Sequence, residues 1–470
     1  MNSQKETKLL ILSLLFTTAV LGLGFWLWSK VSGNNLNSLL SGNNPQSPSG
    51  STSARVSIGE KILVTADTSP DKQAGVQAFA KGDFVTATAK LKASLLKNRN
   101  DPESLIYLNN SQAKNSNSLK IAVSVPIGGN LDVAKEILRG VAQAQDEVNR
   151  GGGINGKLLQ IAIASDDNDP TQAQQVATQF VKDTSILAVV GHNSSNTSIA
   201  AAPIYQQGGL VMISPSSTAQ NLSGIGSYIF RTVPSNGSFA ERLASYTIKT
   251  ARKTNIAICT DSKAIDTQSF RDEFIKGIVA GGGKVNSTTC DIASANFDPN
   301  TLISQFISSG ADGLVLAPNV DRINKALDLA AANNGKLSLF ASPTLYTFQT
   351  LQVGKADVNG LVLPVPWHPQ AIPGNPFVEN AVKLWGGNVN WRTATAYDAT
   401  IAIAKGLQQA STRDDLQQAL HSSNFTANGA TGKIEFLPSG DRSGTAILVK
   451  VQPSSKTSTG YDFVPLLVGI

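Results

Sequence analysis

Residues 188–218 read AVVGHNSSNTSIAAAPIYQQGGLVMISPSST, and the pattern that decides the fold occurs twice around this stretch. An apolar run, Ile186 to Val190, ends at a polar loop of Asn, Ser and Thr. A helix-like segment, Ile199 to Gln207, leads to a second apolar run, Leu210 to Ile213, and a second hydroxyl-rich loop, Ser214 to Thr218. In an open α/β sheet, ligands bind beyond the carboxyl ends of strands, where helix N-termini offer free N–H groups to anions. The stretch predicts a small-molecule site, although helix caps and turns are a simpler interpretation.

The alternation of strand and helix extends over most of the chain. It begins near Leu119, continues past the two loops, and starts a second time near Ser235. This order predicts parallel, doubly wound sheets. After a strand at Gly360 to Val365, later segments return to the first half, so we expect an α/β protein with two Rossmann-like lobes and a cleft.

Composition limits the function classes. The chain has 470 residues and a net charge of +6, with Lys and Arg dispersed, so we expect no nucleic-acid partner. Three histidines and two cysteines cannot build a typical zinc site, and we expect no metal and no cofactor. Cys259 and Cys290 end two strands that we expect to be neighbours, which fits either a disulfide or two buried thiols.

The N-terminus carries an apolar run, Leu9 to Trp28, which is long enough to span a bilayer. Lys5 and Lys8 precede it, and tryptophans lie at its far end. A cleaved signal peptide is the alternative, but no small-residue cleavage site follows directly. We expect residues 1–30 to form an uncleaved signal-anchor, with the rest of the chain exported.

Two segments separate this anchor from the α/β part. Residues 31–70 include a stretch rich in Asn, Ser, Gly and Pro, and we expect a flexible linker. Residues 71–115 have helical apolar spacing and resemble a tetratricopeptide-type unit, with Gly82-Asp83-Phe84 at the turn and Asp101-Pro102 opening the next helix. A single unit is short of a solenoid, so it is either a hairpin packed on the main body or a docking module.

Several patterns associated with enzymes do not fit their required context. Gly151-x-Gly153-x-x-Gly156 has the dinucleotide-binding spacing, but it follows a predicted helix rather than a strand. The acidic cluster Asp166 to Asp169 is best interpreted as a helix cap. His192 and Ser195 are conceivable as base and nucleophile, although a structural histidine is the simpler interpretation. We therefore predict that the protein is not an enzyme.

From about Leu119 to its end, the chain resembles the type I periplasmic substrate-binding proteins of ABC transporters, especially the leucine/isoleucine/valine-binding group. Four stretches carry this resemblance, namely residues 140–170, 188–218, 228–235 and 389–400. It implies an extracytoplasmic binding protein that closes on an amino acid or similar small carboxylate and delivers it to an ABC permease. Together with the predicted signal-anchor, which lies outside the resemblance, this gives a membrane-tethered binding protein. A sensor or interaction protein with the same fold is the alternative.

The resemblance also implies the domain boundaries. The family's lobes are joined by three crossovers, which we place near Pro234, Leu363 and Thr431. Lobe 1 then comprises residues 119–233 and 365–430, and lobe 2 comprises residues 234–364 and 431–470.

The ligand residues of the family are carried over to the two loops and to lobe 2. The ligand's carboxylate is expected on the first loop, at Ser194 and Ser195. The second loop is expected to hold the ligand through backbone and hydroxyl groups, at Ser216, Ser217 and Thr218. In lobe 2 the expected ligand-binding positions are Ile265, Asn319 and Pro343. Ile265 and Asn319 stand where relatives often have aromatic residues, and the loop at Pro343 lacks the acidic residue that usually meets the ligand's ammonium group. Candidates to replace this acid are Asp261, Asp266 and Asp321, although each is equally interpretable as a solvated cap.

Overall fold

The computed structural model describes residues 55–113, 117–444 and 446–466. The predicted anchor, Leu9 to Trp28, and the predicted linker up to residue 54 lie outside the described residues. Within the described ranges, no helix is both long enough and apolar enough to span a membrane.

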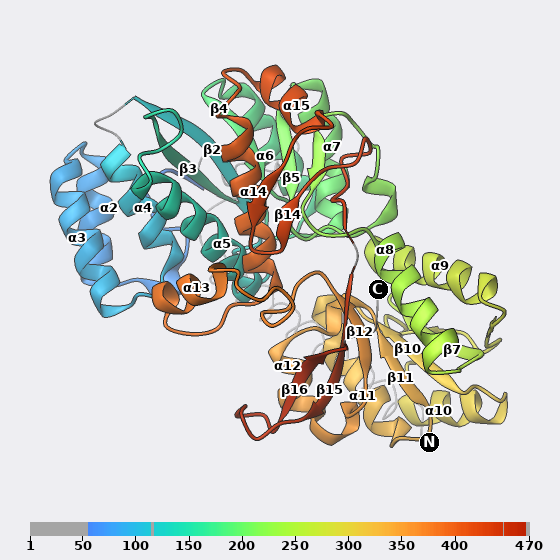
Figure 1. The fold of residues 1–470 in the computed structure, drawn as a ribbon. Coiled ribbons are helices and arrows are strands. Elements are labelled where there is room, and N and C mark those ends of the chain that lie inside the picture. Colours follow the sequence, from blue (N-terminus) through green and yellow to red (C-terminus); the bar gives the residue numbers. More distant parts are fainter. Residues whose placement is uncertain (1–54, 114–116, 445, 467–470) are drawn as a thin grey trace, which may run out of the picture. The chain divides into compact units, whose positions relative to one another are not determined.

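Lobe 1 is built on a sheet with the strand order β1-β3-β2-β4-β5-β6 (Figure 1). Neighbouring strands run parallel except β1, which runs antiparallel to β3. The strands are β1 (Val56–Ser57), β2 (Ser118–Val125), β3 (Leu158–Ser165), β4 (Ile186–Val190), β5 (Val211–Ser214) and β6 (Ile229–Arg231). The helices of this lobe are α5 (Leu131–Arg150), α6 (Pro170–Lys182), α7 (Ser195–Gln207), α13 (Phe377–Trp385), α14 (Trp391–Gly406) and α15 (Arg413–His421). The predicted α/β architecture is therefore confirmed.

Both faces of this sheet are buried, as the continuous apolar strands require. Ile121 and Val123 of β2 contribute to a core shared with α5 and α14, whereas Ala122 faces a second core containing Phe180 of α6 and Tyr205 of α7. Successive side chains of a strand point to opposite faces, which explains the division. The carboxyl ends of β4 and β5 consequently remain free to hold the two hydroxyl-rich loops.

Lobe 2 contains the sheet β16-β15-β12-β11-β10-β7-β8, with β9 also paired to β7. Strands β7 to β12 pair in parallel, while β15 is antiparallel to both β12 and β16. The strands are β7 (Asn255–Thr260), β8 (Lys284–Val285), β9 (Cys290–Asp291), β10 (Gly313–Ala317), β11 (Ser338–Ala341), β12 (Val362–Val365), β15 (Ile447–Pro453) and β16 (Tyr461–Pro465). The helices are α8 (Asn236–Ser245), followed by a π-helical turn (Tyr246–Thr250), α9 (Ile265–Ala280), α10 (Pro299–Ser308), α11 (Ile323–Asn333) and α12 (Phe348–Gly354).

The chain changes lobe between β6 and α8, after β12, and before β15. The third change comes later than the predicted crossover near Thr431. The short hairpin of β13 (Ala427–Gly429) and β14 (Gly432–Ile434) remains with lobe 1 because Asp398 of α14 accepts a hydrogen bond of 2.6 Å from the N–H of Ala430. Asp441, still further on, pairs with Arg231 of β6 at 2.6 Å. The predicted boundary is wrong because the alternating pattern of such hairpins does not say which lobe they join.

Three helices precede the first long strand, namely α2 (Pro70–Ala80), α3 (Phe84–Lys97) and α4 (Pro102–Ala113). Helix α4 is buried along nearly its whole length, between the α2–α3 pair and lobe 1. A buried ion-pair cluster joins these helices, since the Lys72 ammonium lies 2.9 Å from Asp101 and 2.8 Å from Glu103. The helical segment is therefore an integral part of lobe 1.

The prediction of a flexible linker up to residue 70 is wrong from residue 55 onward. Strand β1 pairs with β3, and the carboxylate of Glu103 accepts hydrogen bonds from the backbone N–H groups of Leu63 and Val64. The linker composition ends before β1, and the segment that follows has enough apolar residues to pack on α4.

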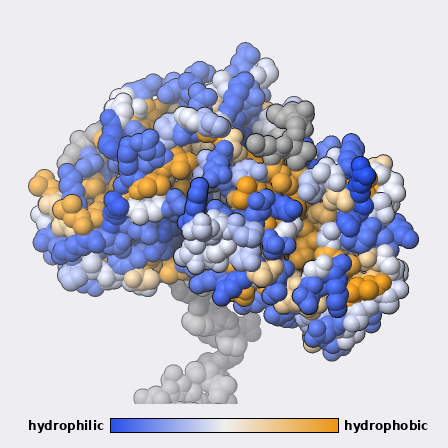
Figure 2. All heavy atoms as spheres, turned by 60° about the horizontal axis from the view of Figure 1, so that its bottom comes forward, coloured by the Kyte–Doolittle hydropathy of each residue, from blue (hydrophilic) through white to orange (hydrophobic). Residues whose placement is uncertain are grey.

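The surface is mixed in polarity. Hydrophilic residues cover much of the face drawn in Figure 2, with apolar residues between them. Among the exposed large apolar side chains are Val85 and Leu96 of α3, which are 78% and 89% exposed.

Candidate functional site

A cavity of about 160 Å³ lies between the two lobes. From lobe 1 it is lined by Asn168, Asn193, Ser194, Ser195, Asn196, Ser216, Thr218, Trp391 and Arg392. From lobe 2 it is lined by Asn236, Ala264, Asp266, Thr267, Phe270, Asn319, Val320, Asp321, Ser342, Pro343 and Thr344. Most of these side chains are polar, and the volume is small for a ligand pocket, so the cavity suits a small, polar molecule.

The first hydroxyl loop forms the N-terminus of α7. Ser194 is the N-cap, and its hydroxyl accepts a hydrogen bond of 3.2 Å from the N–H of Thr197. The Ser195 hydroxyl accepts a hydrogen bond of 3.1 Å from the N–H of Ala219, so its proton is free to be donated elsewhere. The start of this helix thus combines hydroxyl donors with the positive end of a helix dipole, which favours an anion.

The second hydroxyl loop follows β5 and contributes unequally to the cavity. Ser216 and Thr218 line it, but Ser217 does not. Ser217 is fully buried, and its hydroxyl contacts the hydroxyl of Ser198 at 2.7 Å and the backbone oxygen of His192 at 3.3 Å. The expected role of Ser217 in ligand contact is wrong, because its side chain joins the two loops instead.

His192 lies at the start of the first hydroxyl loop, and its side chain is held in the interior of lobe 1. It is fully buried, with Nδ1 at 2.6 Å from Asp166 and Nε2 at 3.0 Å from the hydroxyl of Tyr205. Both ring nitrogens are therefore occupied by groups other than Ser195. A nucleophile–base pair of His192 and Ser195 is not present, and the structural interpretation of the histidine holds.

Lobe 2 contributes two of its three expected positions directly. Asn319 and Pro343 line the cavity, whereas Ile265 does not. The backbone N–H of Ile265 instead donates a hydrogen bond of 3.3 Å to Asn196 across the two lobes. The residues on either side of it, Ala264 and Asp266, line the cavity. The predicted ligand position at Ile265 is therefore wrong by one residue, at the start of α9.

Two of the three candidate acids for an ammonium group lie in the cavity wall. Asp266 and Asp321 line it, while Asp261 is buried and paired with Arg322 at 2.7 Å. Burial raises the pKa of Asp266 from 3.8 to about 6, and the nearby charge of Asp261 adds to this shift. A cationic group placed beside Asp266 would stabilise its ionised form.

Trp391 and Arg392, at the start of α14, were not expected in the site. They lie almost two hundred residues after the hydroxyl loops in the sequence, and only the fold brings them together. One signal was available in the sequence, since Arg392 is the second residue of a segment that is rich in Ala and Thr.

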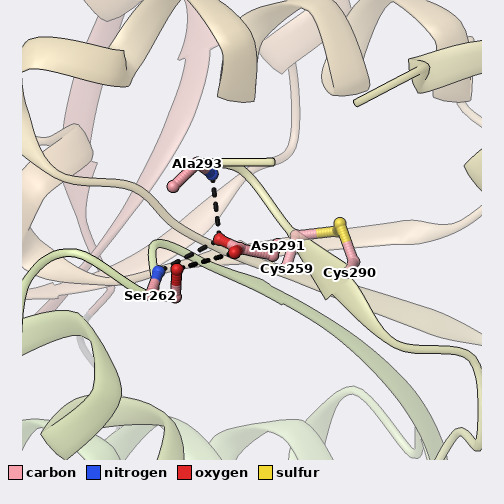
Figure 3. Close-up of a disulfide and its surroundings, with 5 residues drawn as sticks. All are labelled: Cys259, Ser262, Cys290, Asp291 and Ala293. Carbon is pink, nitrogen blue, oxygen red and sulfur yellow. Dashed lines mark hydrogen bonds between the residues drawn. A yellow bond between two sulfur atoms is a disulfide. The ribbon is translucent and has the colours of Figure 1, made fainter. Parts of the chain in front are cut away.

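Cys259 of β7 and Cys290 of β9 form a disulfide in lobe 2 (Figure 3). The next residue, Asp291, accepts hydrogen bonds from the N–H and hydroxyl of Ser262 and from the N–H of Ala293. The bond and these contacts fix the loop that connects β7 with Asp266. The sequence left open whether the two cysteines form a disulfide or remain buried thiols, and the structure has them bonded. A disulfide is typical of proteins in an oxidising compartment.

Within residues 55–113, 117–444 and 446–466, no group of three or more His, Cys, Asp or Glu side chains is arranged to hold a metal ion.

Two lobes with a polar cavity between them define the class of bilobal ligand-binding proteins. Residues 118–456 match the family described as periplasmic binding protein, and the chain belongs to this family. Its members are substrate-binding proteins rather than enzymes, and membership places the chain outside the cytoplasm.

Individual relatives agree with this assignment. The chain is 26% identical to the Leu/Ile/Val-binding protein of Escherichia coli K12 over 300 residues, covering 62% of this chain and 79% of the relative. It is 26% identical over 332 residues to the leucine-, isoleucine-, valine-, threonine- and alanine-binding protein of Pseudomonas aeruginosa, covering 69% of this chain and 87% of the relative.

Solved structures show the same fold. An ABC transporter substrate-binding protein from Desulfitobacterium hafniense, in complex with Leu, aligns with a TM-score of 0.63 at 24% identity, covering 74% of this chain and all of that one. A leucine-binding protein from Thermotoga maritima aligns with a TM-score of 0.64 at 21% identity, covering 73% of this chain and 97% of that one.

Proposed function

We propose that this chain is the solute-binding component of an ABC uptake system, and that it binds an amino acid or similar small carboxylate between its lobes. One observation supports this proposal most strongly. The N-terminus of α7 and the residues Ser195 and Thr218, with their hydroxyl groups, line the same small cavity. In a dry cleft such donors bind a carboxylate by charge-assisted hydrogen bonds. The relatives named above are binding proteins for leucine, isoleucine and valine, and in one case also for threonine and alanine, which supports an amino-acid ligand here.

Asp266 is the group we propose for the ligand's ammonium. It replaces the acid that the loop of Ser342, Pro343 and Thr344 lacks, and it lines the same cavity as the hydroxyl loops. An ammonium buried without a partner would be costly, so an amino-acid ligand requires such an acid.

We further propose that Leu9 to Trp28 anchors the protein in the membrane and that α2, α3 and α4 form a tetratricopeptide-like collar on lobe 1. The apolar length of the N-terminal run supports the anchor. The α2–α3 pair, with Gly82 and Asp83 at its turn, supports the collar.

A sensor or interaction role is the second candidate. Exposed apolar side chains on α3, Val85 and Leu96, favour it, because a collar that docks a partner would present such groups.

Thermal unfolding of the full-length chain in detergent, with a panel of amino acids, amides, sugars and carboxylates, tests the proposal. A ligand at a hundred times its Kd stabilises the folded state by about 2.7 kcal/mol, which is a readable shift. A shift with amino acids supports a carrier. The absence of any shift with a well-folded sample would instead favour the sensor or interaction role.

A further inference from the structure

Three buried polar groups in the wall of the interlobe cavity lack a hydrogen-bond partner within the described part of the chain. They are the hydroxyl of Ser342, the indole N–H of Trp391 and the Nε–H of Arg392. These residues are 3%, 3% and 9% exposed, so their polar groups are largely shielded from bulk solvent. Buried donors are normally paired, and unpaired ones that share a cavity point to a missing acceptor.

Arg392 is the most unusual of the three. Its guanidinium offers five donors, yet no side-chain nitrogen forms a hydrogen bond or ion pair with any described residue. The guanidinium lies over the ring of Trp391, 4.3 Å from the ring centroid, which holds it in place without using its N–H groups. Burial lowers the pKa of Arg392 from 12.5 to about 10, so the group is still positively charged at neutral pH.

Two carboxylates act on Arg392 from neighbouring elements, but neither forms an ion pair with it. Glu136 of α5 already accepts hydrogen bonds from Arg139 at 2.7 Å and from the hydroxyl of Thr393. Asp266 lies across the cavity on α9 and is close enough only for a longer-range attraction. The guanidinium therefore remains available to a ligand.

The position of Arg392 separates it from the hydroxyl loops. Ser194, Ser195 and Thr218 line only the small cavity, whereas Arg392 and Val320 also line an adjoining cavity of about 1010 Å³. Arg392 is thus at the junction of the two cavities. A ligand whose first carboxylate binds the hydroxyl loops would present its other end to this junction.

We propose that Trp391 and Arg392 form a second anion-binding subsite, and that the preferred ligand is an acidic amino acid or another short dicarboxylate. This inference rests on the proposed function, because it requires the first carboxylate on the hydroxyl loops. The guanidinium and the indole N–H pair with the second carboxylate, and the unpaired charge of Arg392 disfavours apolar side chains at this position.

The test compares isosteric ligands on the full-length chain in detergent by isothermal titration calorimetry. L-glutamate is compared with L-glutamine, L-aspartate with L-asparagine, and L-leucine serves as the apolar reference. The variants are Arg392→Gln, Arg392→Lys and Ser195→Ala, with Arg271→Gln as the control for an exposed, paired arginine of α9. Thermal unfolding of each variant separates loss of the subsite from loss of folding.

We expect the wild-type chain to bind each acidic amino acid at least tenfold more tightly than its amide and than L-leucine. Arg392→Gln should abolish this preference, Arg392→Lys should restore part of it, and Ser195→Ala should weaken all ligands alike. Tighter binding of L-leucine, or a preference for acids that survives Arg392→Gln, would overturn the subsite and leave the proposed function intact. The absence of binding by any amino acid or carboxylate would overturn the proposed function, and the subsite with it.

Discussion

The hydroxyl of Ser195 accepts a hydrogen bond of 3.1 Å from the backbone N–H of Ala219, and this bond ties the start of α7 to the loop that follows β5. The two loops come from neighbouring parallel strands, so their carboxyl ends meet at one edge of the sheet. Because the hydroxyl accepts from within the protein, its own proton is left to be donated into the cavity. One side chain therefore both joins the loops and offers a donor to a ligand.

Replacing this residue should affect both roles. In Ser195→Ala, the cavity loses a donor to a carboxylate and the N–H of Ala219 loses its acceptor. We expect about tenfold or greater loss of ligand affinity and about 1 to 2 kcal/mol less stability. Calorimetric titration and urea unfolding measure these two effects.

Ser304→Ala is the matched control, because Ser304 is an exposed helical serine of α10 whose hydroxyl only contacts Asn300 of its own helix. It should leave both quantities nearly unchanged. Equal affinity of Ser195→Ala and the wild type would show that the ligand does not use this hydroxyl.

Asp266 should make stability fall as the pH rises from about 4 to about 6. Burial raises its pKa to about 6 in the folded chain, against about 3.9 in an unfolded one, so the folded state holds the proton longer. Between these values the folded state binds more protons, and the free energy of unfolding decreases with pH by at most about 3 kcal/mol. In Asp266→Asn this contribution is absent, so the variant should gain stability over the wild type at pH 7.5 but not at pH 4.

Urea unfolding of wild type and Asp266→Asn at both pH values measures this difference. Other groups titrate equally in both proteins, and their effects cancel in the comparison. If the difference between the two proteins is the same at pH 4 and at pH 7.5, the perturbed carboxyl is not Asp266.

The architecture could be predicted from the sequence because it depends on local, repeated patterns. The apolar runs before Gly191 and Ser214, with a helix between them, predict two parallel strands without reference to distant parts of the sequence. That pattern predicted a site at the two hydroxyl loops, and the resemblance to the family pointed to Ser194, Ser195, Ser216 and Thr218 within them.

Other parts of the site depend on relationships that no local pattern contains. Ser217 has the same side chain as its neighbour Ser216, yet it points inward, because loop geometry decides which hydroxyl faces the cavity. Arg392 reaches the site only after the chain has returned from lobe 2. The buried carboxylate of Asp398 holds the hairpin of β13 and β14, around Thr431, on lobe 1, and the alternation of residues does not reveal this contact.

The variant Lys72→Met tests how much the helical collar contributes to the stability of lobe 1. Its ammonium is fully buried between Asp101 and Glu103. Lys72→Met removes one partner and leaves two carboxylates buried, for which we expect a loss of about 3 to 5 kcal/mol of stability. The exposed Lys97, paired with Asp71 at 2.6 Å, provides the control, since Lys97→Met removes only a solvent-screened pair and should change stability little. Similar small losses for both variants would indicate that the collar contributes little to the stability of lobe 1.

The disulfide gives a further stability prediction. Cys259 and Cys290 are 31 residues apart in sequence, and closing a loop of this length restricts the unfolded chain by about 3 to 4 kcal/mol. Reduction of the wild type should lower its free energy of unfolding by about this amount, whereas the double variant Cys259→Ser, Cys290→Ser should not respond to reductant. Thiol titration verifies the reduction. A fully reduced wild type that unfolds at the same urea concentration as the oxidised form would contradict the prediction.

The central claim is that a ligand's carboxylate is held between the lobes by the hydroxyls of Ser195 and Thr218. The measurement that tests it most directly is calorimetric titration of the full-length chain and of the double variant Ser195→Ala, Thr218→Ala with the amino acid that stabilises the wild type most. The account predicts a measurable Kd for the wild type and a loss of at least about a hundredfold in the folded double variant, since each charge-assisted hydrogen bond contributes roughly 1.5 to 3 kcal/mol. Unchanged binding by the double variant would place the ligand elsewhere and contradict the account.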